Sequence, residues 1–176
     1  MAIHQHIMDG QLNAEIAVVI GHSHQAKGLE FSANSGIPTR VFEPKNYNSH
    51  DDYDADIVKC LTSFSVDLVV LAGYMKLVGD PMLLAFKGRM VNIHPSLLPS
   101  FKGLNAQQQA LDYGVKVTGC TAHYVVKEMD AGPVILQAAV PVHDDDTVET
   151  LSQRILDQEH QLYYRAIDMA LRQLSR

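Results

Sequence analysis

Short apolar runs alternate with amphipathic stretches along the first half of the chain. Residues 15–20, 39–42, 67–72 and 89–93 have the length and the β-branched composition of strands. Such unbroken apolar runs suit a sheet that is covered on both faces. Because helical periodicity separates the runs, their order predicts an α/β fold with a mostly parallel central sheet, flanked by helices and joined by right-handed crossovers.

The helices predicted between these runs carry start and stop signals. Residues 26–34 are followed by Gly36, which favours the end of a helix. Residues 49–64 open with Ser49, and Asp52 follows at the spacing of a capping box, with aspartate in place of the usual glutamate. Both segments are therefore predicted to be helical.

The second half of the chain has a different pattern. Residues 103–113 have helical periodicity and end at Gly114. Residues 118–126 and 134–140 have the composition of two strands joined by a short turn, and one long apolar stripe follows Thr147. We therefore expect a mixed or antiparallel C-terminal part and a long terminal helix.

Composition narrows the class of protein. The 176 residues are 47% hydrophobic, which predicts one domain over residues 1–176. Lys and Arg number 14 against 20 Asp and Glu, and this negative balance disfavours nucleic acid and membrane surfaces as partners. No apolar run reaches the roughly 20 residues of a membrane span, so a cytoplasmic location is expected. Cys60 and Cys120 form no CxxC pair, and we expect no metal.

The main candidates for catalytic residues lie at the end of the strand predicted at residues 89–93 and directly after it. Alternation along a strand places Asn92 and His94 on the same face. Ligands of parallel sheets bind beyond the carboxyl ends of strands, where this strand gives way to a loop with two prolines. A histidine can donate a proton near neutral pH, and an amide can hold an oxygen that becomes negative. Alone, a histidine at a strand end is more often structural.

Asp130 is the third candidate. It lies in the turn at residues 129–133, where Gly132 allows the backbone to approach a ligand closely. Alone, an aspartate here would usually be a turn former. Together, an amide, an imidazole and a carboxylate can stabilise a tetrahedral acyl-transfer intermediate and move a proton without a serine or cysteine nucleophile.

Four motifs resemble one known family. NIHPSLLP at residues 92–99, GCTAHYV at 119–125, MDAGPVILQ at 129–137 and QEHQLY at 158–163 are similar to those of the phosphoribosylglycinamide formyltransferases. The first motif alone would fit the wider group of 10-formyltetrahydrofolate enzymes. The resemblance implies a single-domain, Rossmann-like formyltransferase fold, monomeric or homodimeric. It also implies formyl transfer from 10-formyltetrahydrofolate to the amine of N1-(5-phosphoribosyl)glycinamide in purine biosynthesis.

The resemblance also implies a set of site residues. Asn92, His94 and Asp130 would be the catalytic trio, with His123 in support. Glu159 would contact the amine of the small-molecule substrate, although a helix glutamate is more often a solvated charge. The residues expected to bind the folate are Met75, Lys76, Leu77, Val78, Asn92, Val126, Lys127, Glu128, Met129, Asp130 and, more weakly, His50.

The sequence also departs from the family pattern. Residues 1–8 fall where the first helix of the family begins, so the first strand and the glycine-rich phosphate loop are expected to be missing. His50 stands at a position where the family has arginine, and Asn105 at one where it has histidine. Two alternatives therefore stay open, hydrolysis of 10-formyltetrahydrofolate and a non-catalytic folate-binding protein.

Overall fold

The computed structural model describes residues 1–74 and 76–174, apart from the side chain of Lys27. These residues form two compact units. Unit 1 comprises Met1–Asp67 and Val78–Lys87, and unit 2 comprises Leu68–Leu77 and Gly88–Arg176. Within the described part of the chain, no helix is both long and apolar enough to cross a membrane. The assignment of residues 1–176 to one formyltransferase domain stays a prediction.

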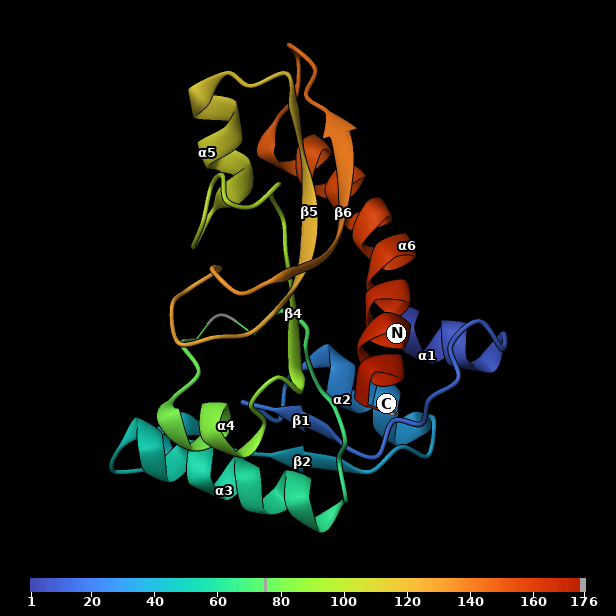
Figure 1. The fold of residues 1–176 in the computed structure, drawn as a ribbon, viewed down its shortest axis with the longest axis vertical. Helices are drawn as coiled ribbons and strands as arrows, with labels where there is room; N and C mark the ends of the chain where they lie inside the picture. The colour runs from blue at the N-terminus through green and yellow to red at the C-terminus, as the bar shows by residue number, and fades with distance from the viewer. Residues whose placement is uncertain (75, 175–176) are drawn as a thin grey trace. The chain divides into compact units, whose positions relative to one another are not determined.

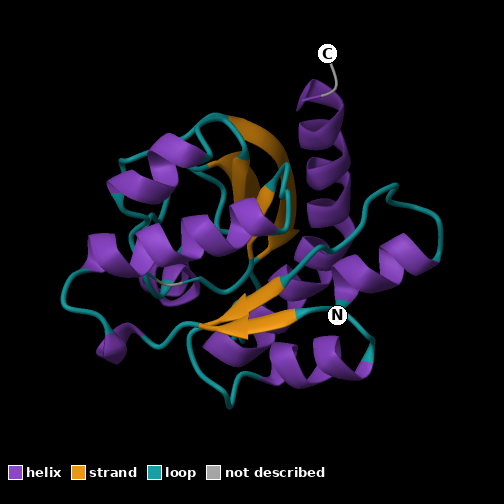
Figure 2. Ribbon diagram, turned by 90° about the horizontal axis from the view of Figure 1, so that it is seen from below, coloured by secondary structure: helices purple, strands orange, loops and turns teal. Residues whose placement is uncertain are grey.

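Unit 1 contains a pair of parallel strands and several helices. Strands β1 (Val19–Gly21) and β2 (Thr39–Val41) lie side by side and point the same way (Figure 2). The first strand is shorter than the predicted residues 15–20, because pairing with β2 begins only at Val19. The helices of this unit are α1 (Ala2–Met8), α2 (Lys27–Asn34), the 3-10 helix η1 (Pro44–Asn46), α3 (His50–Ser63) and α4 (Asp80–Ala85).

Helix α3 begins as its sequence predicts. The Ser49 side chain accepts a hydrogen bond from the Asp52 N–H at 3.1 Å, which satisfies one donor of the first turn. Asp54 is fully buried, and its Oδ2 accepts from the Gly79 N–H at 2.6 Å. This bond fixes the chain just before α4. The buried apolar face of α3 consists of Tyr53, Ile57 and Leu61.

Unit 2 is built on a four-stranded sheet in the order β3-β4-β5-β6, of which Figure 1 labels the last three strands. Its strands are β3 (Val69–Leu71), β4 (Met90–His94), β5 (Val117–Tyr124) and β6 (Val134–Pro141). The first pair is parallel, and the other two pairs are antiparallel. This confirms the mixed C-terminal part. The parallel strands thus occur as two pairs in two sheets.

The long helix α6 (Val148–Leu174) lies beside β4, β5 and β6, and it runs in the direction opposite to β4 (Figure 1). Tyr163 fixes its position along the sheet. The Tyr163 hydroxyl lies 2.6 Å from the carbonyl oxygen of Leu71 and 3.1 Å from that of Val91. Its other buried side chains are Leu151, Ile155, Leu162, Ala166, Ile167 and Ala170.

Helix α5 (Ala106–Tyr113) is shorter than predicted at its start. The helix was expected from Gly103, but Gly103 has φ +78° and Asn105 has φ +58°. Both values lie in the left-handed region, which a right-handed helix cannot include. At the other end Gly114, with φ +78°, ends the helix as predicted.

Candidate active site

The two polar residues of β4 face two residues of β5. Asn92 pairs with His123 and His94 pairs with Thr121 in the antiparallel register, so the four side chains share one face of the sheet. His94 ends the strand and is buried, with 5% of its surface exposed. The structure therefore brings Asn92 and His94 together, as strand alternation predicts, and it adds His123, as the family resemblance implies.

Asp130 completes this cluster from the turn after β5. Its Oδ2 lies 3.3 Å from His94 Nδ1, and its Oδ1 lies 3.7 Å from His123 Nε2. Asp130 has φ +49°, a left-handed conformation that aspartate tolerates better than most residues. The turn folds back tightly, because a β-carbon on Gly132 would come within 1.8 Å of the Tyr124 carbonyl oxygen. Only glycine permits this approach.

The loop after β4 contacts the cluster with main-chain atoms. His94 Nε2 lies 2.8 Å from the carbonyl oxygen of Phe101, and the Gly103 N–H donates to Asp130 Oδ2 at 2.8 Å. Since a carbonyl oxygen only accepts, Nε2 must carry the hydrogen. Both ring nitrogens of His94 thus face oxygen atoms, an arrangement that complements a charged imidazole.

His123 orients the amide of Asn92. Burial lowers the pKa of His123, although its bond to the Tyr124 carbonyl and the Asp130 carboxylate act in the opposite direction. In the neutral ring, Nδ1–H donates to the Tyr124 carbonyl at 2.9 Å, and the bare Nε2 faces the Asn92 Nδ2 at 3.4 Å. An amide carries two N–H donors. The second N–H of Asn92 is therefore not used by His123.

Glu159 is a half-buried carboxyl group of α6. Burial raises its pKa from 4.5 to about 7, and no hydrogen bond joins it to any other described residue. Glu159 precedes Tyr163 by one helical turn. Because α6 runs opposite to β4, it lies nearer than Tyr163 to the carboxyl end of that strand (Figure 1). His94 lies at the same end.

The residues expected to bind the folate are mostly exposed. In unit 2, Leu77, Val126 and Met129 expose 58%, 40% and 48% of their surfaces, and Lys127 and Glu128 are exposed in the same turn as Met129. Lys76 is also exposed in this unit. Met75 lies outside the described residues. Val78 belongs to unit 1.

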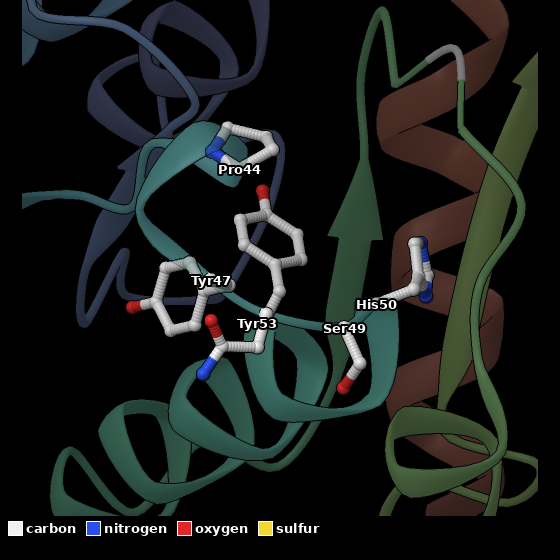
Figure 3. A pocket seen from close by; sticks show the side chains of 6 residues that line it. Pro44, Tyr47, Ser49, His50 and Tyr53 are labelled. Carbon is white, nitrogen blue, oxygen red and sulfur yellow. The ribbon is translucent and has the colours of Figure 1, made fainter.

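His50 also belongs to unit 1, where it begins α3. Its Nδ1 lies 3.6 Å from the buried Asp54 Oδ2. His50 lines a pocket of about 240 Å³ together with Pro44, Tyr47, Asn48, Ser49 and Tyr53 (Figure 3). Its weak assignment to the folate stays a prediction.

Sequence reasoning missed four residues that contact this cluster or its supports. Phe101 and Gly103 contribute main-chain atoms, which leave no signal in the side chains. Tyr163 was hidden by its apolar neighbours in the α6 stripe. Thr121 could have been found, because it alternates with His123 along the same strand.

In this α/β protein, an antiparallel strand pair and the turn after it bring Asn92, His94 and Asp130 together at the end of β4. The sequence matches the Formyl transferase family over residues 1–167. It is also 42% identical to the phosphoribosylglycinamide formyltransferase of Bacillus subtilis over 170 residues, which is 97% of this chain and 87% of that protein. The chain therefore belongs to the formyl transferase family and, within it, to the phosphoribosylglycinamide formyltransferases.

Solved structures agree with this membership. The glycinamide ribonucleotide transformylase 1 of Symbiobacterium toebii superposes with a TM-score of 0.94 at 50% identity, over 96% of this chain and 80% of that one. A longer relative is the trifunctional purine biosynthetic protein adenosine-3 of Gallus gallus, 46% identical over 89% of this chain. The chain spans 16% of the length of that protein.

Proposed function

We propose that this protein transfers a formyl group from 10-formyltetrahydrofolate to the amine of N1-(5-phosphoribosyl)glycinamide, a step of de novo purine biosynthesis. The observation that carries the proposal is the Asp130 carboxylate placed 3.3 Å from a buried His94, beside Asn92, in a formyl transferase. These groups supply the charge stabilisation and the proton transfer that the reaction needs.

The proposed reaction is a direct transfer. The amine nitrogen attacks the formyl carbon, and a new carbon–nitrogen bond forms while the formyl oxygen becomes negative. The bond between the formyl carbon and the folate nitrogen then breaks. One proton leaves the attacking amine and one reaches the folate nitrogen, so charge and atoms balance. No covalent enzyme intermediate and no metal ion enter this scheme.

Each member of the cluster has a role in this scheme. The second N–H of Asn92 would stabilise the negative oxygen. Because Nε2–H of His94 binds the Phe101 carbonyl, Nδ1–H is the group of His94 that would also stabilise this oxygen and donate a proton. Asp130 would support the charged form of His94, since an opposite charge at this distance favours it. Loss of one such donor to a developing oxyanion costs a factor of about 10² to 10³ in turnover.

Glu159 would bind the amine of the acceptor. A carboxyl group that has no protein partner among the described residues, at the carboxyl end of β4, is available to an ammonium or amine group. With a pKa of about 7, it would be partly ionised at neutral pH. The exposed Leu77, Val126 and Met129 would supply apolar contacts to the flat pterin ring, and the turn at residues 126–130 would supply main-chain hydrogen bonds.

The test is an assay of the purified chain with 10-formyltetrahydrofolate in the presence and absence of the acceptor amine. Formyl transfer should require the acceptor and should disappear in His94→Asn. Loss of the formyl group at the same rate without acceptor would identify a hydrolase and overturn the proposal. Folate binding without any turnover would overturn it in favour of a binding protein.

A further inference from the structure

One buried hydroxyl ties the loop after β4 to the neighbouring strands. Thr121 is fully buried on β5, and its Oγ1 donates to the Ser96 carbonyl oxygen at 2.7 Å. The same oxygen accepts from the Leu98 N–H at 3.0 Å and from Gln137 Nε2 at 2.9 Å. A hydroxyl has one hydrogen and two lone pairs, so all its hydrogen-bonding capacity is used.

Two further bonds tighten the same loop. Gln137 Nε2 also lies 3.0 Å from the Leu98 carbonyl oxygen, and Ser96 Oγ donates to the Ser100 carbonyl at 2.5 Å. The residues that follow Ser100 are the ones that reach the cluster. Three of the contacts that hold this loop meet at Thr121 Oγ1, a few residues before Phe101.

The far end of the loop fixes the orientation of the His94 ring. The Phe101 carbonyl accepts from Nε2, and this leaves Nδ1 directed at Asp130 Oδ2. The Gly103 N–H holds that same oxygen in place. Phe101 adopts φ +52°, a conformation that a bulky residue rarely adopts without external support.

We propose that Thr121 is a positioning residue for His94. Its hydroxyl holds the loop at residues 96–103 so that the Phe101 carbonyl binds Nε2 and Nδ1 stays aimed at Asp130. The inference rests on the proposed function, because it assumes that His94 acts in the transfer. It adds a residue that pairs with His94 across the two strands and has no contact with the substrates in the scheme above.

A second threonine on the same strand provides a matched control. Thr118 is 1% exposed, and its hydroxyl has no hydrogen-bond partner among the described residues. Threonine-to-valine substitution at either site replaces a hydroxyl by a methyl group of similar size. Only at position 121 does this remove hydrogen bonds and leave a buried donor and a buried carbonyl of the loop unsatisfied.

The experiment compares Thr121→Val, Thr121→Ser and Thr118→Val in the full chain. Nitrogen NMR shifts of the His94 ring report which nitrogen carries hydrogen, and initial rates give kcat and KM. We expect Thr121→Val to change the shifts of both His94 ring nitrogens, because the ring loses its fixed orientation, and to lower kcat roughly tenfold or more, the scale of one or two lost hydrogen bonds. The KM for the folate should change less than about threefold, since the lost support acts on the reacting geometry.

The conservative variants separate positioning from general stability. Thr121→Ser keeps the hydroxyl and should restore the ring form and kcat, and Thr118→Val should resemble the parent. If Thr121→Val does not fold, Gln137→Met removes one donor to the same oxygen from an exposed position and should shift the ring in the same direction.

Unchanged His94 ring signals in Thr121→Val, or in Gln137→Met where only that variant folds, would overturn the positioning role. A parent chain without formyl transfer would instead reject the proposed function. The ring signals would still decide the role of Thr121.

Discussion

The Gly103 N–H donates a hydrogen bond to Asp130 Oδ2 at 2.8 Å. That oxygen is the one that lies 3.3 Å from His94 Nδ1, so a single carboxylate oxygen serves both the loop and the imidazole. The bond to the loop restricts rotation of the carboxylate and keeps it beside the ring. Substitutions of Asp130 must therefore distinguish the loss of its charge from the loss of its position.

Asp130→Asn makes this distinction. Asparagine also tolerates the left-handed conformation of residue 130, and its side-chain oxygen can still accept from Gly103. The negative charge is lost, and the oxygen that faces His123 becomes an amide nitrogen. Turnover should fall by a factor of roughly 10² or more, the usual scale of acid–base assistance. Rates across pH check this, with the exposed Asp145→Asn as control. Unchanged turnover would reduce Asp130 to a turn residue.

His94→Ala should abolish measurable transfer and leave folate binding nearly intact. The imidazole is expected to stabilise charge that exists mainly in the transition state, so substrate affinity depends on it little. Steady-state rates should fall by about 10² or more. Titration with a folate analogue should give a dissociation constant within about threefold of the parent. A variant with near-parental turnover would remove His94 from the mechanism, and His24→Ala, at an exposed position, is the control.

Glu159 makes the stability of the fold depend on pH. Since burial raises its pKa from 4.5 to about 7, the folded chain binds more protons than the unfolded chain between these values. The stabilising contribution is complete below this window and is lost as the pH rises through it. A shift of this size corresponds to about 3 kcal/mol in the free energy of unfolding.

Glu159→Gln should remove this dependence. Relative to the parent, the variant should gain about 3 kcal/mol in its free energy of unfolding as the pH rises from 4.5 to above 7. Urea denaturation at several pH values measures the difference. Glu30→Gln, at an exposed position, should show the same pH dependence of the free energy of unfolding as the parent. If the free energy of unfolding of Glu159→Gln also changed with pH as that of the parent does, the Glu159 carboxyl group would ionise without a cost from burial.

Tyr163→Phe should destabilise unit 2. The hydroxyl lies within hydrogen-bond distance of the carbonyls of Leu71 and Val91, and its removal leaves both without this donor. The expected loss is about 1–2 kcal/mol in the free energy of unfolding. Denaturant titration measures it, and Tyr113→Phe, at a side chain that is 80% exposed, should cost nothing. Equal stability of the two variants would contradict the anchoring role of Tyr163.

The parts of the fold that depend on local signals could be predicted. Ser49 caps α3, Gly114 ends α5, and alternation along β4 places Asn92 and His94 on one face. These features follow from periodicity and from turn chemistry over a few residues. The roles assigned to the site residues stay predictions, although the structure brings the trio and His123 together.

Features that depend on contacts distant in sequence could not be predicted. Residues 103–105 have helical periodicity, but the bond from Gly103 to Asp130 and two left-handed residues delay α5 to Ala106. Pairing limits β1 and β3 to three residues each, although the apolar runs are longer. The burial of Glu159 likewise depends on the packing of α6, which residue spacing alone does not show.

The oxygen that holds His94 Nε2 is a main-chain atom of Phe101. A main-chain carbonyl is present whatever side chain the residue carries. The bond to the histidine therefore needs no particular side-chain chemistry at position 101, only a residue that can adopt the left-handed conformation of φ +52°. What is inherited here is a conformation, and comparisons of residue identity alone will pass over it.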